Sequence, residues 1–133
     1  MCVFCEIIKG NIPSAKVYED ENTIAILDLS QATKGHTLII PKKHSSNLLD
    51  IDDTSYTNAM IVAKKVAAAL EKTYDAKGFN LLNNCNSIAG QTVNHFHIHI
   101  IPRYNEDDLT IEFVNNEGKH DLAKLAKEIK ENM

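Results

Sequence analysis

Three histidines at alternate positions place the strongest constraint on this chain. Residues 94–102 read NHFHIHIIP, in which His95, His97 and His99 are separated by aromatic and β-branched residues. A period of two with such residues is typical of a β-strand, whose successive side chains point to opposite faces. One face of the predicted strand therefore carries three imidazoles, and the other is apolar and can pack against a core. Because burying an unpaired polar group is unfavourable, we expect a polar, anionic or metallic group to face the imidazoles.

The size and charge of the chain limit the classes of protein that fit. A chain of 133 residues, with 44% hydrophobic and 24% charged residues, has the composition of one globular domain spanning residues 1–133. Its net charge of −4 argues against a broad nucleic-acid-binding surface, which needs a basic stripe. No stretch approaches the roughly 20 apolar residues of a membrane span, and the first ten residues lack the apolar run of a signal peptide. We therefore expect a cytoplasmic protein without nucleic-acid or membrane partners.

The remaining periodicity predicts strands grouped around one long helix. Residues 54–74 have helical spacing, with Asp52 or Asp53 available as the N-cap, and residues 120–130 form an amphipathic helix. This pattern predicts an α+β fold with a largely antiparallel sheet. The other expected elements are a short helix or turn at 2–9, a hairpin of 17–19 and 23–29, and strands at 37–41 and 78–82. The side of the long helix expected to face the core carries Met60, Ala63, Ala67, Leu70 and Tyr74.

Two cysteines near the N-terminus, together with several histidines, suggest a metal site. Cys2 and Cys5 form a C-x-x-C pair, and His36 and His44 lie well before the triad. Two thiolates and two imidazoles suit tetrahedral zinc, and such a site is coordinatively full, so its zinc would be structural. The spacing is not that of a zinc finger, and a redox pair or two unrelated cysteines are alternatives. With Cys85 the cysteine count is three, which disfavours a disulfide framework.

Five segments in the same order resemble the histidine triad (HIT) superfamily of nucleotide-binding hydrolases and transferases. They are FCEIIKGNIP at 4–13, ILDLSQ at 26–31, GHTLIIPKKH at 35–44, AGQTVN at 89–94 and HFHIHII at 95–101. Together they span nearly the whole chain, whereas a lone H-x-H-x-H would be a weak signal. The resemblance implies a HIT-like α+β fold: a five-stranded antiparallel sheet with one long helix, a short N-terminal helix and a C-terminal helix. It also implies a homodimer in which the long helix and a sheet edge of each subunit meet.

The resemblance assigns the chemistry to the triad. His97, the middle histidine, would attack the α-phosphorus of a nucleotide and form a nucleotidyl-histidine, which water would hydrolyse. A neutral imidazole is a good nucleophile near pH 7, and its second nitrogen donates a hydrogen bond, in family members to a backbone carbonyl. His99 would contact the phosphate and leaving group, with His36 as a nearby polar support and Thr92 on the leaving-group side. The transferase branch lacks the third histidine, so its presence here favours hydrolysis.

The resemblance also implies a nucleotide pocket. Asp28 would accept hydrogen bonds from both ribose hydroxyls, Asn84 would lie near the ribose and phosphate, and an apolar slot would hold the base. Gly90 would let the backbone approach the phosphate closely. The alternatives are structural: a strand-end turn for Asp28, an Asx turn for Asn84 and plain core for the slot residues. In full, the expected nucleotide-binding residues are Phe4, Ile7, Ile26, Asp28, Asn84, Gly90, Gln91, Thr92, His97 and His99.

For the metal, the resemblance selects one set of ligands. Related proteins with an N-terminal C-x-x-C bind zinc through those cysteines, the histidine of the KKH segment and the first triad histidine. Here these are Cys2, Cys5, His44 and His95. The Zn²⁺ would be structural, since many members lack the cysteines, and no catalytic metal or organic cofactor is expected.

The leading functional interpretation is a hydrolase of purine nucleotides substituted at the α-phosphate, such as phosphoramidates of AMP or GMP. It would release the nucleoside monophosphate. One alternative with the same chemistry is a dinucleoside polyphosphate hydrolase. An alternative from another class is a nucleotide-binding or scaffold protein with little turnover.

Overall fold

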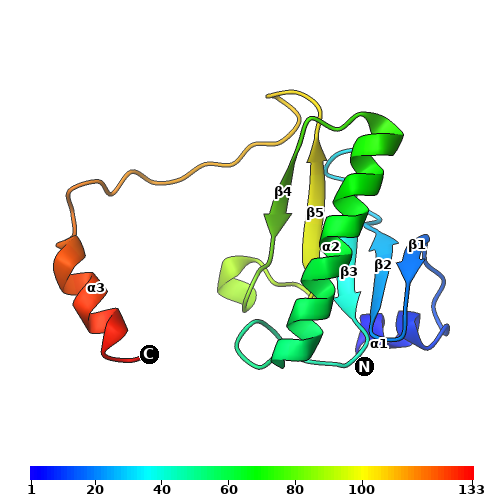
Figure 1. Cartoon of the computed structure of the whole chain (residues 1–133), viewed down its shortest axis with the longest axis horizontal. Coiled ribbons are helices and arrows are strands. Elements are labelled where there is room, and N and C mark those ends of the chain that lie inside the picture. The colour runs from blue at the N-terminus through cyan, green and yellow to red at the C-terminus, as the bar shows by residue number, and fades with distance from the viewer.

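Five strands form one antiparallel sheet in the computed structural model, which describes residues 1–133. The strands are β1 Lys16–Glu19, β2 Thr23–Leu27, β3 Thr37–Pro41, β4 Gly78–Leu82 and β5 Ile98–Arg103. Their order across the sheet is β1-β2-β3-β5-β4, so β1 and β4 are the two edges (Figure 1). Each strand pairs antiparallel with its neighbours. The expected α+β class and the five-stranded antiparallel sheet are thus confirmed.

Three α-helices accompany the sheet: α1 Val3–Ile8, α2 Asp53–Tyr74 and α3 Leu122–Lys130. Helix α2 begins where predicted, because the Asp52 side chain accepts a hydrogen bond from the backbone N–H of Ser55 at 2.9 Å and so satisfies a free donor of the first turn. The helix ends at Asp75, whose left-handed conformation (φ 59°) stops the helical repeat.

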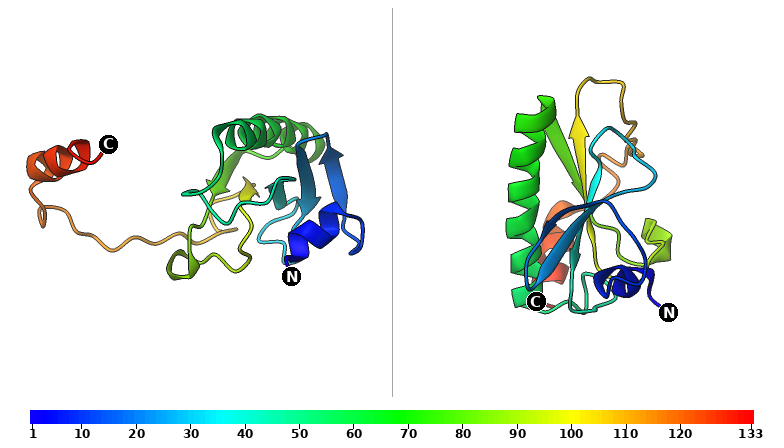
Figure 2. Two further views of the ribbon diagram at one scale, coloured as in Figure 1. Left: turned by 90° about the horizontal axis from the view of Figure 1, so that it is seen from below. Right: turned by 90° about the vertical axis from the view of Figure 1, so that its right-hand side faces the viewer.

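The two faces of the sheet carry separate apolar clusters. Helix α2 covers one face, where its buried side chains pack against the apolar residues of the histidine segment. Helix α1 lies on the other face, where Phe4 packs against Ile24, Ile26, Leu38 and Ile40. Figure 2 shows α1 and α2 on opposite sides of the sheet. The larger cluster consists of Ala25, Ile39, Ala59, Val62, Ala63, Val66, Leu70, Phe96, Ile98 and Ile100.

The buried side of α2 differs from the expected one. Ala63 and Leu70 are buried as predicted, whereas Met60 and Ala67 are only half-buried and Tyr74 is 41% exposed. Ala59, Val62 and Val66 are buried with Ala63 and Leu70. The helix is therefore rotated relative to the prediction, so that Ala59, Val62 and Val66 face the sheet.

The histidine segment is a strand only in its second half, which corrects the prediction of a strand over residues 94–102. Strand β5 begins at Ile98, opposite Ile39 of β3. Continued pairing would place Phe96 opposite Pro41, which has no backbone N–H to donate. The N–H of Phe96 instead donates to the Ser45 carbonyl at 2.8 Å. The side chains still alternate, because Phe96, Ile98 and Ile100 join the cluster under α2.

The end of the chain does not pack against the rest. Every residue from 110 to 133 is exposed, including all of α3, and we refer to these residues as the C-terminal arm. Figure 1 shows α3 standing apart from the sheet at the end of an extended segment, and Figure 2 shows the same separation from another side. Helix α3 forms within the predicted range.

Candidate active site and metal centre

His97 is held in one orientation by the main chain. Its ring nitrogen Nδ1 lies 2.7 Å from the carbonyl oxygen of His95, so Nδ1–H donates and the lone pair is on Nε2. The ring is 7% exposed, and burial lowers its pKa below the usual value. Burial therefore favours a neutral imidazole, and the hydrogen bond, which opposes this shift of the pKa, fixes the direction of the free lone pair.

A chain of hydrogen bonds also fixes the protons of His36 and His99. The backbone N–H of Ala32 donates to Nδ1 of His36 at 3.1 Å, so the proton of His36 is on Nε2. That Nε2–H donates to Nδ1 of His99 at 2.9 Å, which leaves the proton of His99 on its own Nε2. The rings of His97 and His99 lie 5.0 Å apart between centroids. The pair therefore offers one acceptor nitrogen and one donor nitrogen side by side.

The histidine cluster is neutral at physiological pH. Burial, followed by the positive charges that His97 and His36 would carry, lowers the pKa of His99 to about 4, and Asp28 opposes the shift. Burial likewise lowers the pKa of His36. One further proton on the His36–His99 pair would have to sit on His36 Nδ1, facing the N–H of Ala32. The hydrogen-bond pattern and the lowered pKa values agree.

Asp28 lies beside the same two histidines. Its Oδ2 is 3.5 Å from His36 Nε2 and 3.9 Å from His99 Nδ1, while its Oδ1 accepts from the N–H of Ser30 at 2.8 Å. The hydrogen bond of a strand-end turn, the alternative role expected for Asp28, is therefore present, and the second carboxylate oxygen faces the histidines.

The loop between β4 and β5 contains the other expected phosphate residues. Gln91 is buried, and its side chain receives the N–H of Asn86 and donates to the carbonyls of Ser46 and Val93 at 2.6 and 3.0 Å. Its amide thus holds the loop in shape. Thr92 is exposed.

Gly90 occupies a position of this loop that other residues fit poorly. Its φ is +98°, and a Cβ there would lie 3.2 Å from the side-chain nitrogen of Asn84, which donates to the Gly90 carbonyl at 3.3 Å. Gly90 and Asn84 are therefore neighbours, and the Asn84 side chain takes part in the loop turn.

The three residues expected to hold the base meet under α1. Phe4 and Ile26 belong to one apolar cluster and are 6% and 4% exposed, and Ile7 packs against it and is half-buried. The rings of Phe4 and His97 meet in a T-shaped arrangement, with their centroids 5.0 Å apart. Most of the apolar surface of Phe4 and Ile26 is used in the core, so Ile7 offers the most open surface.

Two amides that the sequence did not single out support the site. The side-chain NH₂ of Asn83 donates to the carbonyl of His97 at 2.8 Å. The side-chain NH₂ of Gln31 donates to the carbonyls of Asp28 and His36, both at 2.7 Å. Gln31 was visible only as part of the ILDLSQ segment, and Asn83 only as an asparagine at a strand end.

A second cluster brings together four groups that could bind a metal. Cys2, Cys5, His44 and His95 contribute Sγ, Sγ, Nδ1 and Nδ1, all within 4.8 Å of one another. The other nitrogen of His95, Nε2, donates to the carbonyl of Pro41 at 2.7 Å, so its Nδ1 carries a lone pair directed at the cysteines. Histidines that bind metals typically donate their second N–H in this way.

The spacing of these atoms fits a tetrahedral ion. Sγ of Cys5 is 3.4 Å from Nδ1 of His44 and 3.6 Å from Nδ1 of His95, and the two Nδ1 atoms are 3.1 Å apart. Zinc bonds of about 2.3 Å to sulfur and 2.0–2.1 Å to nitrogen give tetrahedron edges of about 3.3–3.8 Å. The residues present therefore suit Zn²⁺. Burial raises the pKa of the Cys5 thiol, so binding an ion there would release a proton.

Comparison with known proteins identifies the family. A family model described as HIT domain matches residues 9–106, which include the triad and the loop before it. The chain belongs to the HIT family. The five-stranded antiparallel sheet and the three helices of this HIT protein are those that the resemblance implied.

Individual relatives agree with the family match. The adenosine 5'-monophosphoramidase HNT1 of Saccharomyces cerevisiae is 42% identical over 130 residues, which are 96% of this chain and 80% of the yeast protein. A solved HIT family protein from Bacillus anthracis is 42% identical with a TM-score of 0.93, covering 99% of this chain and 96% of that chain. A zinc-bound histidine triad family protein from Mycobacterium smegmatis is 38% identical with a TM-score of 0.79, covering 89% of this chain and 86% of that chain.

The helices carry no sign of membrane insertion. None of them combines the length and the hydropathy that crossing a bilayer requires. The cytoplasmic location stays a prediction from the sequence.

Proposed function

We propose that this HIT protein hydrolyses purine nucleotides that carry a substituent on the α-phosphate, with nucleoside phosphoramidates as the substrate class. One observation carries the proposal: Nδ1–H of His97 donates to the carbonyl of His95 at 2.7 Å, so the lone pair on Nε2 has a fixed direction. A nucleophile that is neutral and oriented before the substrate arrives loses little freedom on attack. The yeast relative named adenosine 5'-monophosphoramidase supports the choice of a phosphorus–nitrogen bond.

The proposed reaction has two steps at phosphorus. Nε2 of His97 attacks the α-phosphorus, so that a nitrogen–phosphorus bond to the protein forms while the bond to the leaving amine breaks. Nε2–H of His99, whose ring lies 5.0 Å from that of His97, donates a hydrogen bond to the leaving nitrogen, and the amine leaves with a proton taken from solvent water, so that His99 stays a neutral imidazole. Water then displaces His97 from phosphorus, loses a proton to solvent and releases the nucleoside monophosphate.

The substrate contacts follow from the same geometry. The Asp28 oxygen that faces the histidines would accept hydrogen bonds from the ribose hydroxyls, and Ile7, with Phe4 and Ile26 behind it, would contact the base. Gly90, Gln91 and Thr92 would line the phosphate side, with Asn84 near the ribose and phosphate. In this proposal Gln91 acts mainly by shaping the loop, because its amide is already hydrogen-bonded.

Trapping the covalent intermediate tests the mechanism. Protein mixed with radiolabelled adenosine 5'-phosphoramidate and stopped with denaturant at neutral or alkaline pH should carry label that acid releases. His97→Ala should carry none while nucleotide binding persists. His120→Ala is the matched control, because His120 is exposed on the C-terminal arm and lies outside both clusters. Unlabelled wild-type protein that still binds the nucleotide would favour a binding protein without turnover.

We also propose a structural zinc ion held by Cys2, Cys5, His44 and His95. Bound there, the ion would cross-link α1 to the start of the histidine segment and add stability. The four-atom geometry and the zinc-bound Mycobacterium smegmatis relative support this proposal.

A homodimer completes the proposed functional form. Strand β4 is an open sheet edge, and its residues Leu81 and Leu82 are 49% and 45% exposed. Ile61 on α2 is 48% exposed. Pairing of two copies along β4 and α2 would cover these side chains, and sedimentation velocity at micromolar concentration should give the mass of a dimer. A monomer would contradict this assembly.

A further inference from the structure

Cys2 and Cys5 lie one turn apart at the start of α1. Cys2 is the N-cap residue, and its Sγ accepts a hydrogen bond from the backbone N–H of Cys5 at 3.4 Å. Residues three apart in a helical turn have Cα atoms about 5 Å apart, inside the range of roughly 4.4–6.8 Å that disulfides span. Both sulfur atoms belong to the four-atom cluster whose members lie within 4.8 Å of one another. The two sulfurs can therefore bond to each other with little movement of the main chain.

This pair of cysteines is open to small reagents in solution. Cys2 and Cys5 are both free and half-buried, and the imidazole of His44, 3.4 Å from Sγ of Cys5, is exposed. Metal ligation and oxidation both use the thiolate form of cysteine. A site that holds two sulfurs as thiolates near the surface is therefore also a site that a peroxide can reach.

Phe4 connects the cysteine pair to the candidate nucleophile. It lies between the two cysteines in α1 and is buried in the apolar cluster on that face of the sheet. Its ring meets those of His95 and His97 in T-shaped arrangements, with centroids 5.9 and 5.0 Å away. A change in how the start of α1 is held therefore reaches the side of the site where the base is proposed to bind.

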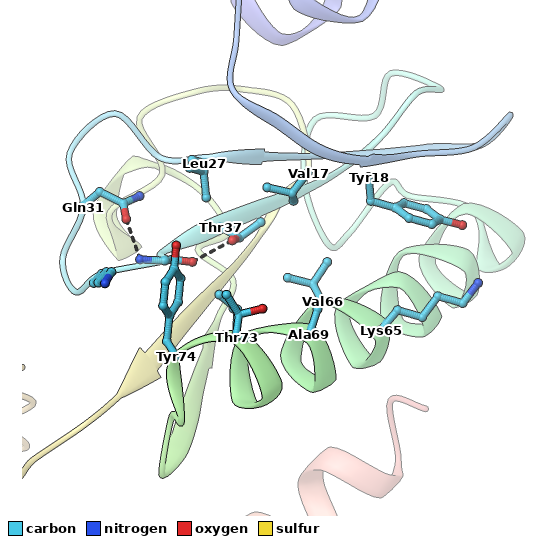
Figure 3. Close-up of a pocket in the computed structure, with 13 residues that line it drawn as sticks. Val17, Tyr18, Leu27, Gln31, Thr37, Lys65, Val66, Ala69, Thr73 and Tyr74 are labelled. Atoms are coloured by element: carbon cyan, nitrogen blue, oxygen red, sulfur yellow. Dashed lines mark hydrogen bonds between the residues drawn. The ribbon is translucent and has the colours of Figure 1, made fainter.

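The part of the site formed by Asp28 and His36 has its own support. The side-chain NH₂ of Gln31 donates to the carbonyls of Asp28 and His36, and its oxygen accepts from the N–H of Gly35, all at 2.7 Å. Figure 3 shows Gln31 at one end of the pocket between β1 and α2, which is on the α2 face of the sheet. None of these bonds involves α1, so a change at the cysteines leaves them in place.

We propose that Cys2 and Cys5 are a reversible modification site, at which a peroxide joins the two sulfurs in a disulfide and the protein releases its zinc ion. The release rests on the zinc site proposed above, whereas formation of the bond needs only the two sulfurs. One thiolate attacks a peroxide oxygen, the O–O bond breaks, and a sulfenic acid and hydroxide form. The other thiolate attacks the sulfenic sulfur and displaces a second hydroxide. Two protons convert the hydroxides to water, so the sulfurs lose two electrons in total and the peroxide gains them.

The disulfide removes two of the four ligands. Only His44 and His95 then remain, and two imidazoles without thiolates do not complete a structural zinc site. Helix α1 loses its cross-link to the histidine segment, while the carbonyl of His95 still accepts from Nδ1–H of His97. The KM for adenosine 5'-phosphoramidate should therefore rise several-fold and kcat should change less than about twofold, because ground-state binding is weakened and the nucleophile keeps its orientation.

Oxidation of the full-length, zinc-loaded protein tests the modification site. In the Cys85→Ser background, a few-fold molar excess of hydrogen peroxide should lower the denatured monomer mass by two hydrogen atoms. A metallochromic dye should detect one zinc ion released per disulfide, and dithiothreitol followed by zinc should restore the starting state. His44→Ala is the matched control, because it keeps both sulfurs and opens the ligand set: it should form the disulfide without zinc release. Cys5→Ser should form no disulfide within the chain.

The outcomes separate this inference from the proposed metal site. An intrachain disulfide that appears together with free zinc and a raised KM supports the inference. Thiols that survive the peroxide, bonds formed only between chains, zinc that stays bound after the disulfide forms, or an unchanged KM would each overturn it. Protein that takes up no zinc before oxidation contradicts the metal site itself, and this is seen before the oxidant is added. If Cys85→Ser is unstable, peptide mapping of the oxidised wild type locates the bond.

Discussion

Replacing Cys5 by alanine should separate stability from chemistry. Sγ of Cys5 lies 3.4 Å from Nδ1 of His44 and 3.6 Å from Nδ1 of His95, so its removal opens the tetrahedral ligand set. His97 does not use Cys5, because its orientation comes from the backbone carbonyl of His95. The variant should therefore lose zinc-dependent stability and keep its nucleophile.

The size of the loss follows from ligand linkage. A ligand that binds only the folded state adds about 4 kcal/mol when its free concentration is about 1,000 times its Kd. Unfolding entropy of about 2.1 cal/mol/K per residue gives about 0.28 kcal/mol/K for 133 residues. In the presence of zinc the Tm of Cys5→Ala should therefore lie roughly 15 °C below that of the wild type.

Circular dichroism melts with zinc and with a chelator measure this difference. Cys85→Ala is the matched control, because Cys85 is a free, half-buried cysteine outside the metal cluster. Wild type and Cys85→Ala should both lose stability on chelation, whereas Cys5→Ala should not respond to zinc. At 25 °C Cys5→Ala should still form the nucleotidyl adduct. Loss of the adduct without loss of Tm would refute this division of roles, as would a wild-type Tm that zinc does not change.

Three further predictions concern the site and its support. His99 has a pKa of about 4 in the folded protein against 6.5 ordinarily, so the unfolded chain binds more protons and the free energy of unfolding should fall by up to about 3 kcal/mol from pH 7 to pH 4. In urea unfolding of the zinc-free Cys5→Ala variant, adding His99→Gln should make this fall smaller, and an equal fall would refute the assignment. Gly35→Ala should lower the free energy of unfolding by about 2 kcal/mol, because φ is +97° and a Cβ would lie 2.7 Å from a methyl group of Leu70. Thermal melts would show the loss as a lower Tm, and an unchanged Tm would contradict the prediction. Asn83→Ala removes the 2.8 Å hydrogen bond to the His97 carbonyl and should lower kcat roughly 5- to 10-fold, a loss of about 1 kcal/mol of transition-state stabilisation, with zinc content unchanged. An unchanged kcat would show that Asn83 does not position His97.

The alternation of the histidine segment was sufficient to predict which side chains share a face. A period of two depends only on the geometry of an extended backbone, so Phe96, Ile98 and Ile100 were assigned correctly to the core. The start of β5 at Ile98 depends on the partner strand, because Pro41 lies where the ladder would continue. Such a cause lies more than 50 residues away in the chain and has no local signal.

Other features depend on tertiary structure in the same way. The contact of Asn83 with His97 follows from the pairing of β4 with β5, which brings the end of one strand beside the start of the other. The phase of α2 was misjudged because its many alanines make several faces apolar, and only packing on the sheet selects one. The proposed metal ligands came from the resemblance to the HIT superfamily, since residue types and spacing alone left open which two histidines would join Cys2 and Cys5.

His95 contacts both the cysteine–histidine cluster and His97, each with a different part of the residue. The imidazole belongs to the cysteine–histidine cluster, while the main-chain oxygen accepts the hydrogen bond from Nδ1–H of His97. Every amino acid at position 95 would bring the same main-chain oxygen, so the cysteine–histidine cluster can be lost by substitution without turning the His97 ring. Descendants of such a chain could therefore lose the cluster one residue at a time and keep the orientation of that ring.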